Sequence, residues 1–274
     1  MGLKKRSRQE NILAALRSRP SARLGELAEQ FAVSKETIRR DIAELSSRGL
    51  VARTYGGALP SRLNAEPRLR ERMRINPEGR RRMAETAARL VRDARVLMID
   101  TGATMSHVCE RLAAVVPQDA RAARTVITNG IHNLTILAEN PAIRTIVCPG
   151  TYDEGEGATF GPLTLEFIGR FHAEAMIVSA SGMDAERVTD ANSDAVAIKR
   201  AMLKLAERRI LVIDVHKLGQ AQFETVCGLE ALDDVVTDAE PAAAIRAALE
   251  RAGARLHVAA ERAGQMSLTG SGAL

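Results

Sequence analysis

Tryptophan is absent from this 274-residue sequence, and its aromatic residues are limited to five phenylalanines and two tyrosines. So few aromatic side chains argue against stacking of single-stranded bases and against an aromatic platform for carbohydrate. The chain also lacks any run of about 18 apolar residues, and its N-terminus goes from charged residues into an amphipathic segment. We therefore predict a cytoplasmic protein with no membrane partner.

Residues typical of metal sites and of covalent catalysis are equally scarce. The three cysteines, Cys109, Cys148 and Cys227, are scattered and lack the paired spacing of a zinc site, and the five histidines show no ligand spacing either. The sequence contains no nucleophile elbow, no P-loop and no catalytic serine, histidine and aspartate set. We expect reduced thiols, no metal, no cofactor and no catalytic residue.

Charge divides the chain unevenly. Counting Lys and Arg against Asp and Glu, residues 1–60 hold 12 and 6, residues 61–100 hold 11 and 6, and residues 101–274 hold 16 and 22. A basic head on an acidic body suggests that the head binds nucleic acid, because neutralisation of phosphates drives such binding. The length leaves room for this small head and one larger domain.

Two short helices joined by a tight turn are predicted within the basic head. Apolar residues follow helical stripes before and after the turn, at Leu24, Leu27, Ala28 and Phe31 and then at Ile38, Ile42 and Leu45. Ser34 is placed to cap the second helix, and only Ala32 and Val33 separate it from the first. This spacing predicts a helix-turn-helix whose later helix is free to enter a DNA major groove.

A short strand and a glycine turn follow this second helix. Residues 50–55 are suited to a strand that ends at Gly56 and Gly57, after a helix cap at Gly49. The unit is therefore predicted to be a winged helix-turn-helix over residues 1–60, with the wing touching phosphate or minor groove. The DNA-binding candidates are Ser34, Lys35, Thr37, Arg39, Arg40, Arg53 and Tyr55.

Residues 8–58 resemble the N-terminal domain of the DeoR family of bacterial transcription regulators. The resemblance rests on Glu26-Leu27-Ala28, Phe31, Val33-Ser34, Thr37-Ile38-Arg39-Arg40-Asp41, Leu45, Gly49-Leu50, Arg53 and Gly56-Gly57-Ala58. It implies that the unit binds double-stranded operator DNA. A solvated basic helix face is the alternative for Arg39 and Arg40 taken alone.

Residues 61–82 are predicted to be a basic linker. Pro67, Pro77 and Gly79 are expected to break helices there, and arginines recur throughout the segment. Those arginines either follow DNA phosphates beside the wing or line a solvated hinge. The last segment, residues 261–274, is rich in glycine and serine and is expected to be disordered.

An open α/β domain with a mostly parallel sheet is predicted over residues 83–260. Six short apolar runs without alternation are typical of strands buried on both faces, namely residues 96–100, 125–128, 145–148, 175–179, 210–214 and 235–238. Segments of helical length, including residues 194–208 and 241–252, lie between them or after them.

Polar residues and glycines follow several of these strands, at the edge where such sheets bind ligands. The turn Asp100-Thr101-Gly102-Ala103-Thr104 opens a helix whose amides and hydroxyls suit a phosphate group. Lys199 either snorkels from a core face or binds the ligand, whereas Lys217 follows the strand end at Asp214 and precedes Gly219, a better position for binding a ligand group. The effector-binding candidates are Asp100, Thr101, Gly102, Thr104, Asn129, Gly182, Asp184, Lys199, Asp214 and Lys217.

Residues 83–260 are similar to the DeoR sensor domain, whose fold is related to that of ribose-5-phosphate isomerase and the CoA transferases. The matching pieces are Asp100-Thr101-Gly102-Ala103-Thr104, Thr128-Asn129, Gly182-Met183-Asp184, Ile198-Lys199-Arg200-Ala201-Met202, Asp214, Lys217, Gly219 and Thr237-Asp238. The resemblance implies a phosphorylated sugar or related metabolite as effector. Because operators usually have paired half-sites, we also expect a homo-oligomer.

Three functions follow as hypotheses. The first is a sequence-specific transcriptional regulator, a repressor of a sugar operon. The second is a sugar-phosphate isomerase with an accessory DNA-binding domain, for which Asp100, Asp184 and Asp214 offer carboxylates. The third is a protein that coats DNA without sequence preference. We favour the first, because no catalytic set accompanies the carboxylates.

Overall fold

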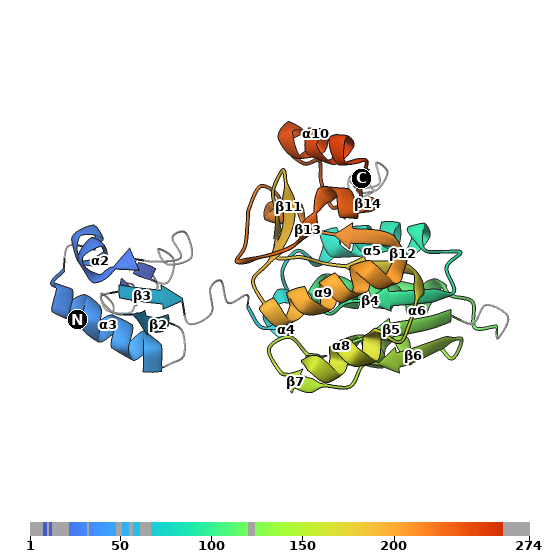
Figure 1. Ribbon diagram of the computed structural model, residues 1–274, viewed down its shortest axis with the longest axis horizontal. Coiled ribbons are helices and arrows are strands. Elements are labelled where there is room, and N and C mark those ends of the chain that lie inside the picture. The colour runs from blue at the N-terminus through green and yellow to red at the C-terminus, as the bar shows by residue number, and fades with distance from the viewer. Residues whose placement is uncertain are drawn as a thin grey trace, which may run out of the picture.

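The computed structural model describes residues 8–9, 11–12, 22–31, 33–47, 51–54, 57–60, 67–119 and 124–259 (Figure 1). Predictions for Gly49, Tyr55, Gly56, residues 61–66 and the tail from residue 261 lie outside this part of the chain.

The helix-turn-helix prediction is confirmed in the N-terminal unit. Helix α2 (Leu24–Gln30) and helix α3 (Lys35–Ser47) share a small core with Ile12, formed by Leu27, Ala28, Ile38, Ile42 and Leu45. The Ser34 hydroxyl accepts a hydrogen bond from the Thr37 amide at 3.2 Å, so Ser34 caps α3 as predicted. Phe31 and Val33 pack against this core at the turn between the helices.

A wing follows α3, as predicted. Strand β2 (Val51–Thr54) pairs antiparallel with β3 (Gly57–Pro60), and β3 also pairs with β1 (Ala22–Arg23) ahead of α2. The three-stranded sheet was predicted only in part, because a strand of two residues leaves no periodic signal in the sequence.

The segment predicted to be a linker differs in its second half. Helix α4 (Leu69–Arg72) and the start of α5 (Pro77–Leu90) lie within it. Pro77 does not break a helix but begins one, since the first turn needs no amide donor, and Gly79 lies in that same turn. Asn76 caps α5 from a left-handed conformation (φ 49°) by accepting a hydrogen bond from the Gly79 amide.

Seven parallel strands form the central sheet of the α/β unit (Figure 1). They are β4 (Val96–Ile99), β5 (Arg124–Thr128), β6 (Ile143–Val147), β9 (Ala173–Val178), β12 (Ala206–Val212), β14 (Asp234–Thr237) and β15 (Arg255–Val258). Their order is β15-β14-β12-β9-β4-β5-β6. The chain thus starts in the middle at β4, proceeds to one edge, and returns to β9 on the other side, which makes the β4–β9 boundary a topological switch point.

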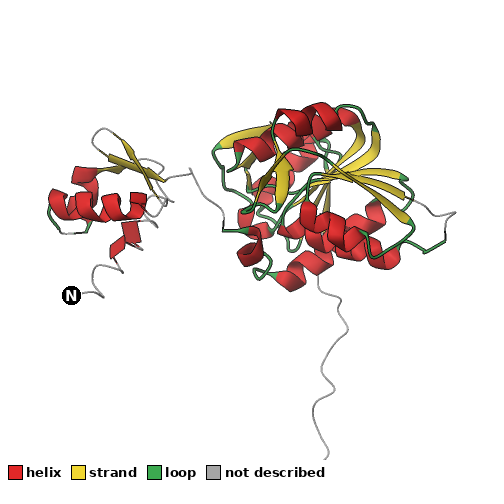
Figure 2. Cartoon of the chain, turned by 90° about the horizontal axis from the view of Figure 1, so that it is seen from below, coloured by secondary structure: helices red, strands yellow, loops and turns green. Residues whose placement is uncertain are grey.

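Helices cover both faces of this sheet, which explains the continuously apolar strands (Figure 2). One face packs against α5, α6 (Ala103–Val115) and α7 (Ile131–Leu137), and the other packs against α8 (Pro162–Ile168), α9 (Ser193–Leu205) and α10 (Ala243–Ala252). Along β4, Leu97 and Ile99 belong to the first core and Met98 to the second. The predicted fold class is confirmed.

Two smaller sheets were not predicted. Strands β10 (Gly182–Met183), β11 (Arg187–Asp190) and β13 (Glu224–Gly228) form one, and the hairpin of β7 (Thr151–Asp153) and β8 (Ala158–Phe160) forms the other. Short 3-10 turns occur at Val215–Lys217 and Leu229–Ala231. These sheets matter because β11 and the turn between β7 and β8 each contribute a carboxylate to the candidate site.

Candidate functional site

A pocket of about 400 Å³, counting space open to solvent, lies at the carboxyl ends of β4 and β9. This is the switch point of the sheet, where open α/β folds bind small molecules. Its lining residues are Arg72, Arg80, Thr101, Gly102, Ala103, Thr104, Glu156, Ser179, Ala180, Ser181, Asp190, Ala195, Lys199 and Lys217. Four of these side chains are cationic and two are carboxylates.

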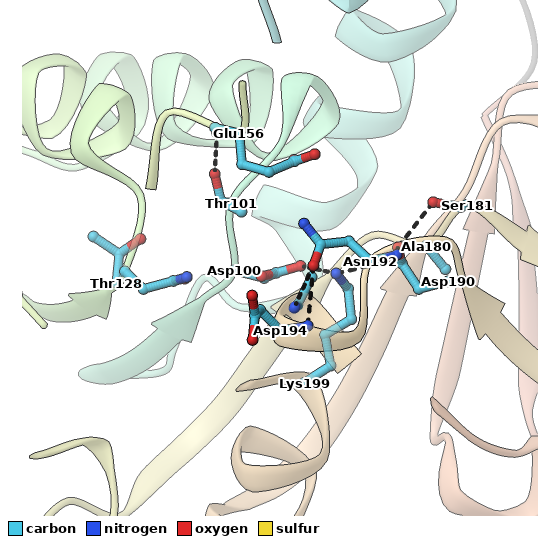
Figure 3. Close-up of polar contacts among 12 residues, drawn as sticks. Asp100, Thr101, Thr128, Glu156, Ala180, Ser181, Asp190, Asn192, Asp194 and Lys199 are labelled. Atoms are coloured by element: carbon cyan, nitrogen blue, oxygen red, sulfur yellow. Dashed lines mark hydrogen bonds and ion pairs between the residues drawn. The ribbon is translucent and has the colours of Figure 1, made fainter. Parts of the chain in front are cut away.

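Lys199 occupies the floor of this pocket between two aspartates (Figure 3). Its Nζ lies 2.9 Å from Asp100 Oδ2 and 3.1 Å from Asp190 Oδ2, and all three side chains are nearly inaccessible to solvent. The Ser181 hydroxyl donates a hydrogen bond to the second oxygen of Asp190. Lys199 therefore does not snorkel from a core face but forms a buried ion-pair triad.

Burial and ion pairing oppose each other within the triad. Burial alone would lower the pKa of Lys199, but the charges of Asp100 and Asp190 more than offset this effect, so its pKa is raised and the ammonium stays protonated. Burial raises the pKa of Asp100, and the nearby Lys199 opposes that rise. Lys199 is thus the cation that offsets part of the cost of burying Asp100.

Backbone amides form another wall of the pocket. Helix α6 begins after Gly102, and no side chain caps its first turn. Gly102 has φ +118°, a conformation that favours glycine, and a Cβ there would lie 3.2 Å from the Ser179 hydroxyl. The positive end of the 13-residue helix faces the pocket beside Thr101 and Thr104, an arrangement suited to an anion.

The remaining cations come from three separate places. Arg72 ends α4 and forms an ion pair with Glu156, with 2.5 Å between Arg72 Nη2 and Glu156 Oε2. Arg80, from the first turns of α5, is 4% exposed and donates a hydrogen bond to the Arg72 carbonyl. Lys217 donates a hydrogen bond to the Ala180 carbonyl at 2.9 Å.

The structure gathers only part of the predicted effector set at the pocket. Thr101, Gly102, Thr104, Lys199 and Lys217 line it, and Asp100 lies directly behind Lys199. The others lie outside the lining and have structural partners, namely Asn129, Gly182, Asp184 and Asp214.

Each of these four residues has a structural role in the fold. The Asn129 amide donates to the Thr159 carbonyl, and the Asp184 carboxylate accepts from two amides of its own turn. Gly182 lies in β10, where a Cβ would lie 2.4 Å from the Gln220 carbonyl oxygen. Asp214 accepts a hydrogen bond of 2.5 Å from Asn76, which also donates to Asp238.

Sequence reasoning missed Arg72, Arg80, Glu156 and Asp190. The two arginines stand in the basic run that was assigned to the linker, and no local signal distinguishes them from their exposed neighbours. Asp190 ends a strand that is too short for its alternation to be recognised. Ser181 lies beside the predicted Gly182, so the strand-end pattern marked this place in the chain.

The predicted DNA-binding residues of α3 lie on its outer face. Lys35, Arg39 and Arg40 are exposed, and the partner of both arginines on this helix is Glu36, at 2.5 and 3.6 Å. Asp41 lies on the opposite, buried side, where it accepts a hydrogen bond from Arg8. Arg53 lies in β2, and Tyr55 is outside the described residues.

Within the described part of the chain, no group of three or more His, Cys, Asp or Glu residues is arranged to hold a metal ion. Over the same residues, no helix is long and apolar enough to cross a membrane. Burial raises the pKa of the Cys148 thiol to about 12 and that of Cys227 to about 11.

Comparison with known families decides the affiliation. The model of the DeoR C terminal sensor domain matches residues 75–239, more than half of the chain, and that of the DeoR-like helix-turn-helix domain matches residues 8–61. The chain belongs to the DeoR family. This DeoR-family protein therefore combines a DNA-binding unit with a sensor domain and is a DNA-binding transcriptional regulator.

Curated relatives of this DeoR-family protein match over most of their length. It is 29% identical to the L-fucose operon activator of Haemophilus influenzae, over 84% of this chain and 91% of the relative. The glycerol-3-phosphate regulon repressor of Escherichia coli is also 29% identical, over 87% and 93%. The regulator GlpR of Haloferax volcanii is 30% identical, over 83% and 87%.

Among solved structures, ribose 5-phosphate isomerase A from Methanocaldococcus jannaschii is similar at 14% identity and a TM-score of 0.38. The match covers 52% of this chain and about half, 55%, of the isomerase.

Proposed function

We propose that this DeoR-family regulator represses a carbohydrate catabolic operon and that a phosphorylated sugar in the switch-point pocket sets its affinity for operator DNA. The observation that carries the proposal is the convergence of Arg72, Arg80, Lys199 and Lys217 with the uncapped start of α6 on one pocket. Guanidinium groups, ammonium groups and helix amides together suit a phosphoryl group.

The remaining polar groups suit the sugar part of such a ligand. The hydroxyls of Thr104 and Ser181 can donate or accept hydrogen bonds with sugar hydroxyls. The pocket wall contains no aromatic side chain for sugar stacking, so hydrogen bonds and charge would supply the specificity. The names of the relatives support the carbohydrate assignment, since they include regulators of glycerol-3-phosphate, fucose and aga genes. More of these names describe repressors than activators, which favours repression.

A ligand screen tests the effector. Thermal unfolding would be followed with glucose 6-phosphate, fructose 6-phosphate, ribose 5-phosphate and glycerol 3-phosphate, each beside its unphosphorylated counterpart. We expect at least one phosphorylated compound to raise the melting temperature, because a ligand that binds only the native state stabilises it. Lys217→Met should abolish this increase. An increase caused equally by the unphosphorylated counterparts would contradict the anion site.

Arg39 and Arg40 of α3 are proposed as major-groove contacts. Arg39→Ala and Arg40→Ala should each weaken binding to an operator fragment by about 1–3 kcal/mol if the side chain reads a base. The matched control is Arg170→Ala, because Arg170, in the turn that follows α8, is similarly exposed and pairs with Glu166 as Arg39 pairs with Glu36. Fluorescence anisotropy with operator and random duplexes measures the effect. Equal affinity for the two duplexes would instead favour the non-specific coating protein.

Binding without turnover is the part of the proposal that concerns chemistry. Asp100 is fully buried and ion-paired with Lys199, so it is not poised to move a substrate proton. Asp214 accepts from Asn76 and from the His216 amide, a structural role. Incubation with ribose 5-phosphate and hexose phosphates should yield no isomerised product. Turnover that disappears in Asp100→Asn would establish the isomerase alternative.

A homo-oligomer is the expected form on DNA. Paired half-sites need at least two recognition helices related by symmetry. Sedimentation equilibrium of the full chain should give a mass of at least twice 29.6 kDa. A monomer that binds a single half-site would contradict this expectation.

A further inference from the structure

Helix α4 is held against the turn between β7 and β8. The Leu69 amide donates a hydrogen bond of 2.8 Å to the Gly155 carbonyl, and Arg72 pairs with Glu156 at 2.5 Å. Gly157 lies so close that a Cβ there would be 2.7 Å from a Leu69 methyl carbon. The Arg72 and Glu156 side chains are only 12% and 15% exposed, so solvent screens this ion pair weakly.

The same turn is fixed to the floor of the pocket. The Thr101 hydroxyl donates a hydrogen bond of 3.1 Å to the Glu156 carbonyl, and Thr101 directly precedes Gly102 at the start of α6 (Figure 3). On the other side, Arg80 donates to the carbonyl of Arg72. A pocket ligand near α6 would therefore also lie near the Arg72–Glu156 pair, which belongs to the pocket wall.

We propose that Arg72 is a ligand-binding residue that exchanges Glu156 for the anionic group of the effector, so that an occupied pocket releases α4 from the β7–β8 turn. This inference rests on the proposed function, because it assigns the regulation of the same site. The Arg72–Glu156 pair is thus a latch, closed when the two side chains are paired and open when Arg72 binds the effector.

Electrostatics gives the latch its direction. A phosphoryl group that enters among the cations brings negative charge close to the Glu156 carboxylate, and the two repel each other strongly where water is scarce. The phosphoryl group also offers Arg72 the same bidentate geometry as a carboxylate. The ligand therefore favours the open latch over the closed one, which is the differential affinity that any ligand-driven switch requires.

Chain connectivity carries the change toward the DNA-binding unit. Strand β3 ends at Pro60, and Leu69 begins α4, with residues 61–68 between them. Eight residues reach at most about 28 Å when fully extended. A displacement of α4 therefore alters which positions the winged helix can adopt, and hence whether it can be placed on an operator half-site.

The latch can be opened without any ligand, which provides the test. Glu156→Gln keeps the size of the side chain but removes the charge that holds Arg72. In the full-length protein without added ligand, this variant should change operator affinity by about 5-fold or more, within the usual range of allosteric coupling. The matched control is Glu154→Gln on the same turn, because Glu154 pairs with Arg68 at 3.2 Å but is 75% exposed. It should change affinity by less than about 2-fold.

Hydrogen exchange provides a second measurement. The amides of residues 69–73 should exchange faster in Glu156→Gln than in the wild-type protein, whereas those of the α6 helix should not change. Inorganic phosphate, used as the probe, should accelerate the same amides in the wild-type protein and have little further effect in the variant. If Glu156→Gln does not fold, as judged by circular dichroism, Arg72→Gln removes the other partner and should give the same changes.

The outcomes separate this inference from the proposed function. If a sugar phosphate stabilises the protein but Glu156→Gln leaves both operator affinity and α4 exchange unchanged, the latch is refuted and the proposed function stands. If Glu156→Gln changes both but no phosphorylated sugar binds, the latch is supported and the proposed effector class is wrong.

Discussion

Replacing Lys199 by methionine should leave the carboxylates of Asp100 and Asp190 buried without their shared cation. The side chains of Lys199, Asp100 and Asp190 are 4%, 0% and 7% exposed, so solvent screens the two ion pairs only weakly. Breaking a buried ion pair by removing one partner typically costs about 3–5 kcal/mol. For a domain of this size, that loss lowers the melting temperature by about 6–20 °C. Lys204→Met is the control, because Lys204 is exposed on the same helix.

The loss should depend on pH in a definite direction. Burial raises the pKa of Asp100 above 3.8, so its stabilising contribution is present below the unfolded pKa and is lost as pH rises through the folded value. Without Lys199 the main opposition to that rise is lost and only the hydrogen bond from the Thr101 backbone still lowers the pKa of Asp100, so the variant suffers most at neutral pH. The stability difference from the wild type should therefore narrow as the pH falls to about 4.

Urea unfolding followed by circular dichroism measures both effects. The double variant Lys199→Met with Asp100→Asn should recover a large part of the lost stability, because it removes one of the two stranded charges. The reasoning is refuted if Lys199→Met loses less than about 1 kcal/mol at neutral pH, or if its loss does not change with pH.

Three further predictions concern other parts of the chain. Ser34→Ala should lower the stability of the N-terminal unit by about 1 kcal/mol through loss of the α3 cap, measured by urea unfolding of the full chain; no change would mean that the cap is replaced. Burial alone would raise the pKa of Asp234, but hydrogen bonds from Arg208 and His257 lower it below 3.8. The contribution of Asp234 to folding stability is therefore lost as pH falls through that lowered value, and Asp234→Asn should reduce this acid sensitivity. Burial raises the thiol pKa of Cys148 to about 12 and that of Cys227 to about 11, so iodoacetamide at neutral pH should label both slowly until the protein is unfolded, as mass spectrometry would show.

The fold was largely predictable because its main strands are buried on both faces. Residues 96–99 are apolar without interruption, since alternate side chains enter different cores, and such runs stand out in a sequence. Strand β11, in contrast, has only four residues, and two of them are Arg187 and Asp190. It is too short and too polar to be recognised in the sequence. Its place depends on pairing with β13, more than 30 residues later in the chain.

The sequence predicted a pocket residue only where a suitable polar side chain or glycine stands at a recognisable strand end or helix start. Thr101 and Gly102 follow a strand and begin a helix, so their role is visible in the chain itself. Arg72 and Arg80 look like the other arginines of residues 62–82, and their burial is a product of tertiary contacts. Asp214 was predicted to bind the effector because, like Thr101, it stands at a strand end, but its carboxylate accepts a hydrogen bond from Asn76 instead.

The switch point of the sheet brings together two stretches of chain that are synthesised one after the other. Thr101 belongs to the first stretch, which contains β4, β5 and β6, whereas Ser181 and Lys199 belong to the second, which contains β9 and β12. A molecule bound between them holds the two stretches together and so adds to the free energy of unfolding of the whole domain. If a metabolite binds there, it would therefore also slow the degradation of the regulator, and the amount of regulator in the cell would follow the concentration of that metabolite.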